Sequence, residues 1–178
     1  MKIFDCTTFY NEKLLMEARF NILDQFVYKF IVVESVFSHS GIKKKLNFNI
    51  NDYPDFKNKI EYIVINNEPE DLIKDEHLLK QSIYKRFNSV KRIEQSYNYM
   101  HLGIKDASEE DLIMISDNDE IPNLDSLEFK NSKNNFYIFE QLFFYYRFNL
   151  LYEGNGNKLT LNSNTTNNLL HIEPDGKI

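Results

Sequence analysis

The sequence has no tryptophan, a single cysteine and no long apolar run. Cys6 stands alone among 178 residues, so an internal disulfide is impossible and a reducing compartment is the simpler expectation. No segment is apolar for long enough to span a bilayer, and the amino-terminal residues do not resemble a signal peptide. We therefore expect a cytoplasmic protein without a transmembrane segment, which would meet a membrane only peripherally, from its surface.

Positive charge is also scarce. The 27 Asp and Glu residues outnumber the 21 Lys and Arg residues, which gives a formal net charge of -6 at pH 7. Binding to nucleic-acid phosphates needs concentrated basic residues, so we expect no nucleic-acid partner. The hydrophobic fraction of 42% and the charged fraction of 27% are typical of globular rather than disordered chains. The length fits a single domain with a core of its own.

A short apolar run followed by a group of acids is the most informative stretch. Residues 112–116 are almost wholly apolar, too few for a free helix and typical of a buried strand. Asp117, Asp119 and Glu120 follow directly, and Pro122 ends the strand. Alternate residues share one face of a strand, so Asp117 and Asp119 would repel each other unless a cation lay between them. Such oxygen ligands suit Mg²⁺ or Mn²⁺; the alternative is a solvated acidic turn.

Apolar spacing predicts an alternation of strands and helices. Continuous apolar, β-branched or aromatic runs predict strands at 2–6, 28–34, 60–65, 112–116 and within 135–148. Three-to-four spacing predicts helices from 11 or 12 to 26 and from about 75 to 104. This order predicts an α/β domain with a mostly parallel central sheet flanked by helices.

Ligands of such sheets bind at the carboxyl ends of the strands. The turn at Thr7 and Thr8, the acid Glu34 and the aspartate pair would all lie at this edge. Glu34 has two interpretations that we leave open, a contact to the ribose or base of a nucleotide, and a helix-capping or salt-bridge role. Lysines 43–45 are interpreted as a solvated face, with contact to phosphate as the alternative.

Asn11 and Glu12 are interpreted as a helix start with a capping function rather than as direct substrate contacts. His39, flanked by Ser38 and Ser40, would either contact a substrate or belong to a solvated polar loop. The sequence alone leaves both alternatives open for His39.

Several segments together carry a family pattern. They are residues 5–12 (Asp-Cys-Thr-Thr-Phe-Tyr-Asn-Glu), 30–35 (Phe-Ile-Val-Val-Glu-Ser), 39–41 (His-Ser-Gly) with Lys44, Leu46 and Phe48, 103–107 (Gly-Ile-Lys-Asp-Ala), 116–122 (Ser-Asp-Asn-Asp-Glu-Ile-Pro) and 141–146 (Gln-Leu-Phe-Phe-Tyr-Tyr). In this order they resemble glycosyltransferase family 17, the family of the bisecting β-1,4-N-acetylglucosaminyltransferase of N-glycans. The resemblance covers roughly residues 3–153.

The resemblance implies a GT-A type, Rossmann-like fold and inverting transfer from a UDP-sugar, UDP-N-acetylglucosamine in the known activity, to a mannoside or other glycan or polysaccharide acceptor. It implies that Asp117 and Asp119 bind Mn²⁺ or Mg²⁺, which would stabilise the diphosphate leaving group. The donor-binding residues that it suggests are Thr7, Phe9, Asn11, Glu34, His39, Ser40, Gly41, Asn98 and Asp117. Inversion also needs a base for the acceptor hydroxyl. Glu120 is the first candidate for that base, with Glu140 and Glu153 as alternatives.

This chain departs from the family pattern in two places. Family members usually carry Gln-Arg-Asn where residues 96–98 read Ser-Tyr-Asn, so we expect Arg92 or Lys91 to replace the missing arginine. Family domains also extend further, so we divide the chain into a domain at 1–153 and a low-complexity tail at 154–178, interpreted as truncated, poorly ordered or a peripheral hairpin. The alternatives to a glycosyltransferase are a truncated, non-catalytic nucleotide-sugar-binding remnant and a phosphatase with a nucleophilic aspartate.

Overall fold

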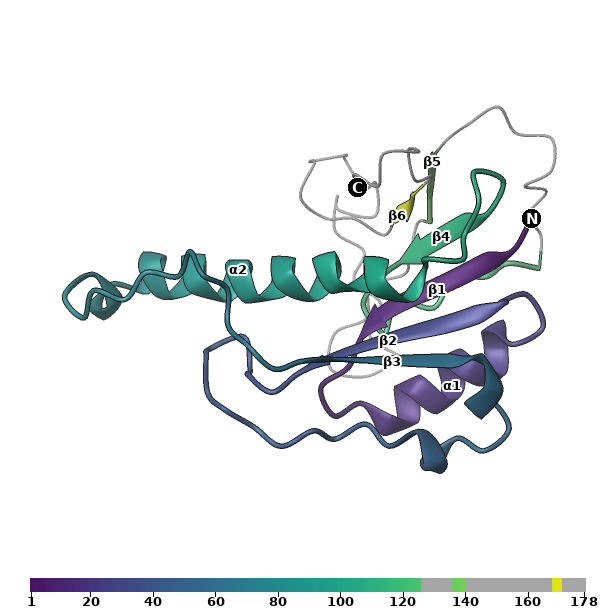
Figure 1. The fold of residues 1–178 in the computed structure, drawn as a ribbon, viewed down its shortest axis with the longest axis horizontal. Helices are drawn as coiled ribbons and strands as arrows, with labels where there is room; N and C mark the ends of the chain where they lie inside the picture. Colours follow the sequence, from purple (N-terminus) through teal and green to yellow (C-terminus); the bar gives the residue numbers. More distant parts are fainter. Residues whose placement is uncertain (126–135, 140–167, 171–178) are drawn as a thin grey trace, which may run out of the picture.

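A six-stranded sheet forms the centre of the protein in a computed structural model, which describes residues 1–125, 136–139 and 168–170 (Figure 1). The strands are β1 (Ile3–Thr8), β2 (Lys29–Ser35), β3 (Ile60–Ile65), β4 (Leu112–Ile115), β5 (Phe136–Ile138) and β6 (Asn168–Leu170). The α-helices are α1 (Lys13–Leu23) and α2 (Ser82–Tyr99), and the 3-10 helices are η1 (Ile50–Asp52), η2 (Lys57–Lys59), η3 (Leu78–Lys80) and η4 (Met100–Gly103).

The strand order is β3-β2-β1-β4-β6-β5. The first four strands of this order are mutually parallel, whereas β6 runs antiparallel to both β4 and β5. The register places Cys6 of β1 opposite Ile31 of β2 and Ile115 of β4, so these three strands end at the same edge. The predicted α/β domain with a mostly parallel sheet flanked by helices is confirmed.

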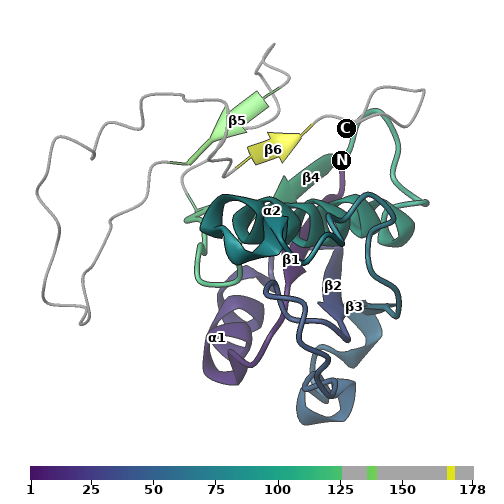
Figure 2. The same cartoon turned by 90° about the vertical axis from the view of Figure 1, so that its left-hand side faces the viewer.

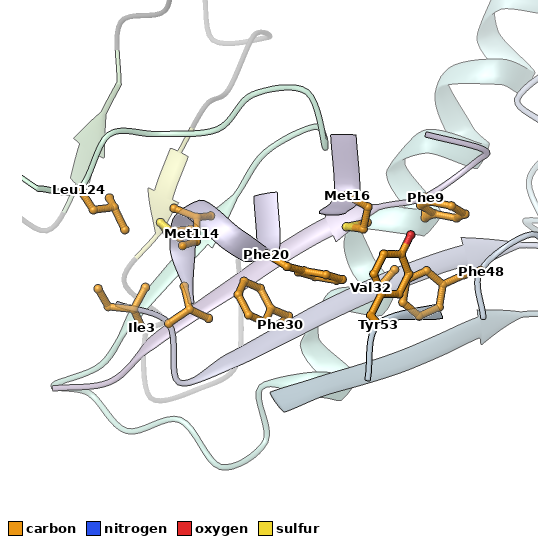
Figure 3. Close-up of a cluster of buried hydrophobic side chains, with 12 residues drawn as sticks. Ile3, Phe9, Met16, Phe20, Phe30, Val32, Phe48, Tyr53, Met114 and Leu124 are labelled. Atoms are coloured by element: carbon orange, nitrogen blue, oxygen red, sulfur yellow. The ribbon is translucent and has the colours of Figure 1, made fainter. Parts of the chain in front are cut away.

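Two hydrophobic clusters lie on opposite faces of the sheet, because successive strand side chains point to opposite sides. One cluster joins α1 to the sheet and to the segment around η1, and Figure 3 shows it. In it the ring of Phe20 lies 4.7 Å from that of Phe30 and 5.1 Å from that of Tyr53, measured between centroids. Full burial of a phenylalanine contributes roughly 1.5–3 kcal/mol, so α1 is held firmly against β2.

The second cluster joins η4 and the end of α2 to the other face (Figure 2). Gly103 permits this packing, since a Cβ at that position would lie only 2.6 Å from Cγ1 of Ile31 on β2. The amino-terminal half of α2 extends beyond the sheet in Figure 1, and Ile83, Phe87 and Val90 on it are exposed by 67%, 43% and 50%. Only the carboxyl-terminal part of this long helix therefore contributes to the core.

Several predicted boundaries differ from the observed ones. The predicted helix at 75–104 is divided, because Gln81 has extended backbone angles (φ -88°, ψ 136°) between η3 and α2. Asp75 instead accepts hydrogen bonds from the backbone N–H groups of His77 and Leu78 and starts the 3-10 turn. The predicted helix ending at residue 26 ends at Leu23, and the strand at 60–65 is confirmed.

The carboxyl-terminal predictions lie mostly outside the described residues. Of the expected strand within 135–148, residues 136–138 form β5. Within the predicted tail, residues 168–170 form β6, which lies between β4 and β5. The division at residue 153 stays a prediction. Over the described ranges, each helix is too short or too polar to traverse a bilayer.

Candidate functional site

A pocket of about 250 Å³ opens where β1, β2 and β4 end. Its lining comes from the turn after β1, the loop after β2, one face of α2 and the acidic loop after β4. The lining residues are Thr8, Phe9, Tyr10, Glu12, Leu15, Val33, Ser35, Phe37, His39, Lys44, Arg92, Ser96, Asp117, Asn118 and Asp119. The pocket therefore occupies the edge at which α/β sheets with parallel strands bind their ligands.

The acidic loop after β4 presents its two aspartates to this pocket. Side-chain exposure alternates along the loop: Ser116 and Asn118 are each only 7% exposed, whereas Asp117 and Asp119 are exposed. Both aspartates line the pocket. Both side chains therefore reach the same pocket, although β4 ends at Ile115 and the aspartates stand in a turn rather than in the strand end that the sequence predicted.

Tyr97 on α2 contacts the first of these aspartates. Its hydroxyl donates a hydrogen bond of 2.9 Å to Oδ1 of Asp117. Burial, followed by the charge of Asp117 and this hydrogen bond, raises the pKa of Tyr97, so the phenol stays protonated at neutral pH. Tyr97 is the residue for which the family resemblance led us to expect an arginine, and it places a neutral donor beside Asp117.

Arg92 and the turn at 39–41 form another wall. The guanidinium donates to the backbone oxygen of His39 at 3.2 Å and to Oε1 of Glu68 at 2.7 Å from Nε and 2.5 Å from Nη2. Gly41 has a φ of 85°, a conformation that favours glycine, and a Cβ there would lie 2.5 Å from Nη2 of Arg92, so a larger residue would be strained and would displace the guanidinium. Lys91 instead pairs with Asp71 and Glu94 and is absent from the pocket lining.

The pKa of the His39 imidazole, which lies in this wall, is shifted in opposite directions by its surroundings. Desolvation is the largest of these effects and lowers the pKa, Asp117 acts against it, and Arg92 reinforces it. The net direction is downward, so His39 is neutral at pH 7 and can donate or accept a hydrogen bond.

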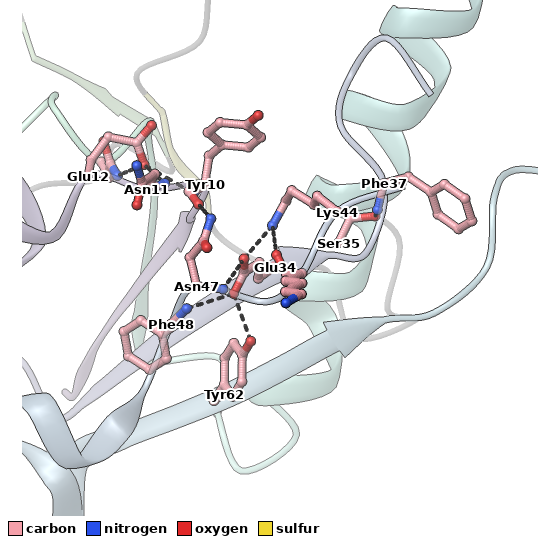
Figure 4. A network of polar contacts seen from close by, with 12 residues as sticks. Tyr10, Asn11, Glu12, Glu34, Ser35, Phe37, Lys44, Asn47, Phe48 and Tyr62 are labelled. Carbon is pink, nitrogen blue, oxygen red and sulfur yellow. Dashed lines mark hydrogen bonds and ion pairs between the residues drawn. The ribbon is translucent and has the colours of Figure 1, made fainter. Parts of the chain in front are cut away.

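Glu34 anchors the loop after β2 (Figure 4). Its carboxylate is buried and accepts hydrogen bonds from the Lys44 ammonium, from the backbone N–H groups of Asn47 at 2.8 Å and Phe48 at 3.0 Å, and from the Tyr62 hydroxyl at 2.8 Å. Four donors converge on one side chain that does not line the pocket. Of the two interpretations left open by the sequence, the structure shows the salt bridge.

The sequence model of glycosyltransferase family 17 matches residues 1–156 of the 178. The chain belongs to glycosyltransferase family 17. Family 17 membership implies glycosyltransferase activity, and with it a sugar donor and an acceptor. Neither a comparison with curated proteins nor one with solved structures found a match.

Several predicted donor-binding residues of this family 17 protein lie in the pocket. Phe9, His39 and Asp117 line it, together with the predicted metal ligand Asp119. Thr7 does not, because it points to the opposite face of β1 and is buried; Thr8 takes the pocket position. Strand alternation is the signal that would have separated the two threonines.

Four further predicted residues are also absent from the pocket lining. They are Asn11, Ser40, Gly41 and Asn98. Ser40 lies instead in a neighbouring cleft beside α2, and Gly41 supports Arg92 as described above. Asn98 is exposed on α2 and offers its backbone oxygen to His101. Their contact with a donor stays a prediction without support from this geometry.

Glu120 has a position that differs from the one expected of a base. Its carboxylate accepts a hydrogen bond of 3.2 Å from the backbone N–H of Asp117, and its own N–H donates to the Asp117 carbonyl at 3.1 Å. Glu120 does not line the pocket. It therefore closes the acidic loop, while Glu140 and Glu153 lie outside the described residues.

The aspartate pair fits a divalent cation that is shared with a substrate. Among the residues that the structure describes, no group of three or more His, Cys, Asp or Glu side chains is arranged to hold a metal ion. Mg²⁺ and similar cations commonly take one or two carboxylates and fill their other positions with waters and substrate phosphates. Two exposed carboxylates facing one pocket are consistent with such a site.

Proposed function

We propose that this family 17 protein is a metal-dependent, inverting glycosyltransferase that moves N-acetylglucosamine or a related sugar from a UDP-sugar to a mannoside or other glycan hydroxyl. The observation that carries the proposal is the common orientation of Asp117 and Asp119 toward one pocket at the carboxyl edge of the parallel strands. These aspartates hold Mn²⁺ or Mg²⁺, which when bound supplies positive charge at the diphosphate leaving group.

The remaining pocket residues suit a nucleotide-sugar. Tyr10 and Phe37 provide aromatic surface for a flat base or a sugar ring, whereas Phe9, which also lines the pocket, is only 4% exposed. Lys44 and Arg92 provide positive charge, each already oriented by a carboxylate, Glu34 and Glu68 respectively. Such fixed partners keep the cationic groups in place before the substrate arrives, which favours electrostatic stabilisation of the leaving group.

The proposal predicts that donor binding depends on the cation. We expect Mn²⁺ to strengthen UDP binding by about 10-fold or more, as measured by calorimetry, and Asp119→Ala to remove that increase. Asp125→Asn is the matched control, because Asp125 is also exposed and lies outside the pocket. Equal UDP affinity with and without manganese would contradict the proposal. A screen of UDP-sugars with mannoside acceptors then tests which sugar is transferred.

A further inference from the structure

Arg19 of α1 and Asp5 of β1 form an ion pair in the interior. Both side chains are 0% exposed. The guanidinium binds the carboxylate through two parallel hydrogen bonds, 2.8 Å from Nε to Oδ2 and 2.7 Å from Nη2 to Oδ1. Desolvating two charges costs several kcal/mol for each ion, and an apolar pair of similar volume is often no less stable. Stability alone is therefore a weak reason for a charged pair at this position.

The other donors of Arg19 are directed at the acidic loop. Nη1 donates to the backbone oxygens of Asp117 and Glu120, each at 3.0 Å, with a longer contact of 3.5 Å to that of Asn118. Nη2 donates to Oγ of Ser116 at 2.6 Å, and this hydroxyl donates in turn to the Glu120 carbonyl at 3.1 Å. One buried side chain thus contacts four residues of the loop.

We propose that Arg19 is a positioning residue for the metal-binding pair, an inference that rests on the proposed function. Drawing the carbonyl oxygens inward fixes the backbone of the loop, and the side chains of Asp117 and Asp119 are thereby left facing the pocket. The guanidinium suits this task because its planar fork directs several N–H groups to separate acceptors at once. A lysine would bring a single, rotating ammonium to the same place.

Asp5 has a second part in this arrangement. An unpaired guanidinium beneath the loop would repel a divalent cation bound above it and would attract the two aspartates itself. The Asp5 carboxylate neutralises that charge while leaving Nη1 for the loop carbonyls. The pair therefore orders the acidic loop without adding net positive charge, so the negative potential that attracts the cation is not weakened.

The test uses two variants of the full chain. The double variant Asp5→Leu with Arg19→Met replaces both ions by apolar side chains of comparable size and avoids a lone buried charge. Arg19→Lys keeps the charge opposite Asp5 and removes the fork. Arg86→Met is the control, because Arg86 is exposed on α2 and lies outside the donor pocket. Circular dichroism and urea unfolding establish that each variant is folded.

Two measurements then separate positioning from stability. Hydrogen exchange by mass spectrometry reports the loop directly: we expect exchange in a peptide covering residues 116–122 to become about 10-fold faster in the double variant, while peptides from β2 and β3 are unchanged. Calorimetry with Mn²⁺ alone reports the site, and we expect binding to weaken by about 10- to 100-fold, with Arg19→Lys intermediate in both measurements.

Loop exchange at the wild-type rate in either folded variant, or wild-type Mn²⁺ affinity, would overturn the assignment of Arg19. If the double variant does not fold, Arg19→Lys alone decides by the same criteria. Equal UDP affinity of the wild-type protein with and without Mn²⁺ would contradict the proposed function instead, and the exchange measurement would still show whether Arg19 holds the loop.

Discussion

Glu12 connects the turn after β1 to the acidic loop through a single carboxylate. Its Oε2 accepts hydrogen bonds from the backbone N–H groups of Tyr10 at 3.0 Å and Asn11 at 2.9 Å, and from Nδ2 of Asn118 at 3.0 Å. Glu12 stands at the start of α1, as predicted, but its side chain does not cap the helix. The carboxylate makes no hydrogen bond to an N–H group within the helix and instead accepts hydrogen bonds from N–H groups that precede it. Partial burial acts to raise the pKa of Glu12, but these hydrogen bonds prevail and lower it.

This lowered pKa makes part of the stability depend on pH. A carboxylate whose pKa is lower in the folded than in the unfolded protein contributes stability above the unfolded value, about 4.3 for glutamate, and loses it as the pH falls through the folded value. We expect the difference in unfolding free energy between wild type and Glu12→Gln to be constant from about pH 7 to about pH 5.5 and to shrink below about pH 4.3. Urea unfolding at a series of pH values measures this difference.

Glu17→Gln serves as the control for this series, since Glu17 is exposed on α1. If the two variants show the same dependence on pH, the hydrogen bonds of Glu12 contribute nothing to acid sensitivity.

At the residue scale the sequence singled out the aspartate pair but not the side chain that supports it. The acids after an apolar run drew attention to Asp117 and Asp119; the structure ends β4 at Ile115 and places both in the turn that follows, and their role as metal ligands stays a prediction. Arg19 was missed, because a single arginine in an amphipathic helix is ordinarily exposed. A signal was present: Arg19 interrupts the apolar face of α1, and Asp5 interrupts an apolar strand, so two opposite charges in buried segments would have suggested a pair.

Among the elements, η4 and β2 pack closely at Gly103. A methyl group on Gly103 would approach Cγ1 and Cγ2 of Ile31 to 2.6 and 2.8 Å, far inside normal contact. We expect Gly103→Ala to destabilise the protein by about 1–3 kcal/mol, because overpacking forces β2 and η4 apart. Urea unfolding measures the loss.

A double-mutant cycle identifies the cause of that loss. Ile31→Ala removes the side chain that the new methyl group would meet, so the loss from Gly103→Ala should be about 0.5–3 kcal/mol smaller in its presence. Strictly additive losses would mean that the cost of Gly103→Ala has another origin, such as the local backbone of η4.

The bounds of helices and strands were predicted correctly where hydrophobicity alone determines where an element begins and ends. The strand at 60–65 is a compact apolar run between loops, and its observed bounds agree with the prediction. The helix at 75–104 was predicted from spacing alone, and spacing continues through Gln81, where the backbone becomes extended. Helical periodicity cannot detect such a break when no glycine or proline marks it, and the competing bonds from Asp75 depend on local geometry.

For the molecule as a whole, β6 is the notable addition to the matched domain. It lies beyond residue 156, where the family match ends, and pairs Leu170 with Ile113 of β4 and Phe136 of β5. Without it, β4 would have an open edge directly before the acidic loop, and open edges promote association between chains. Residues 168–170, which lie in the segment predicted to be a tail, therefore take part in the central sheet, and the division at residue 153 stays a prediction.

Truncation after residue 156 tests this dependence. We expect the shortened chain, which retains the full matched range, to lose about 5 °C or more in Tm and to associate in sedimentation experiments, since its β4 edge is uncovered. Truncation after residue 170 is the control, because it retains β6. Equal Tm values for both shortened chains would show that the β4–β6 pairing contributes little.

The contact between Arg19 and the Asp117 carbonyl spans 98 positions of the chain. Contacts of such high sequence separation form late, because most of the loop-closure entropy must be lost first. The pocket edge therefore forms in a nascent chain only after β4 has docked beside β1, and the manganese binding that we propose would appear during refolding only once this topology is complete. A ligand that binds the folded but not the unfolded chain stabilises the fold, so substrate-saturated protein should resist proteolysis better than the free protein does.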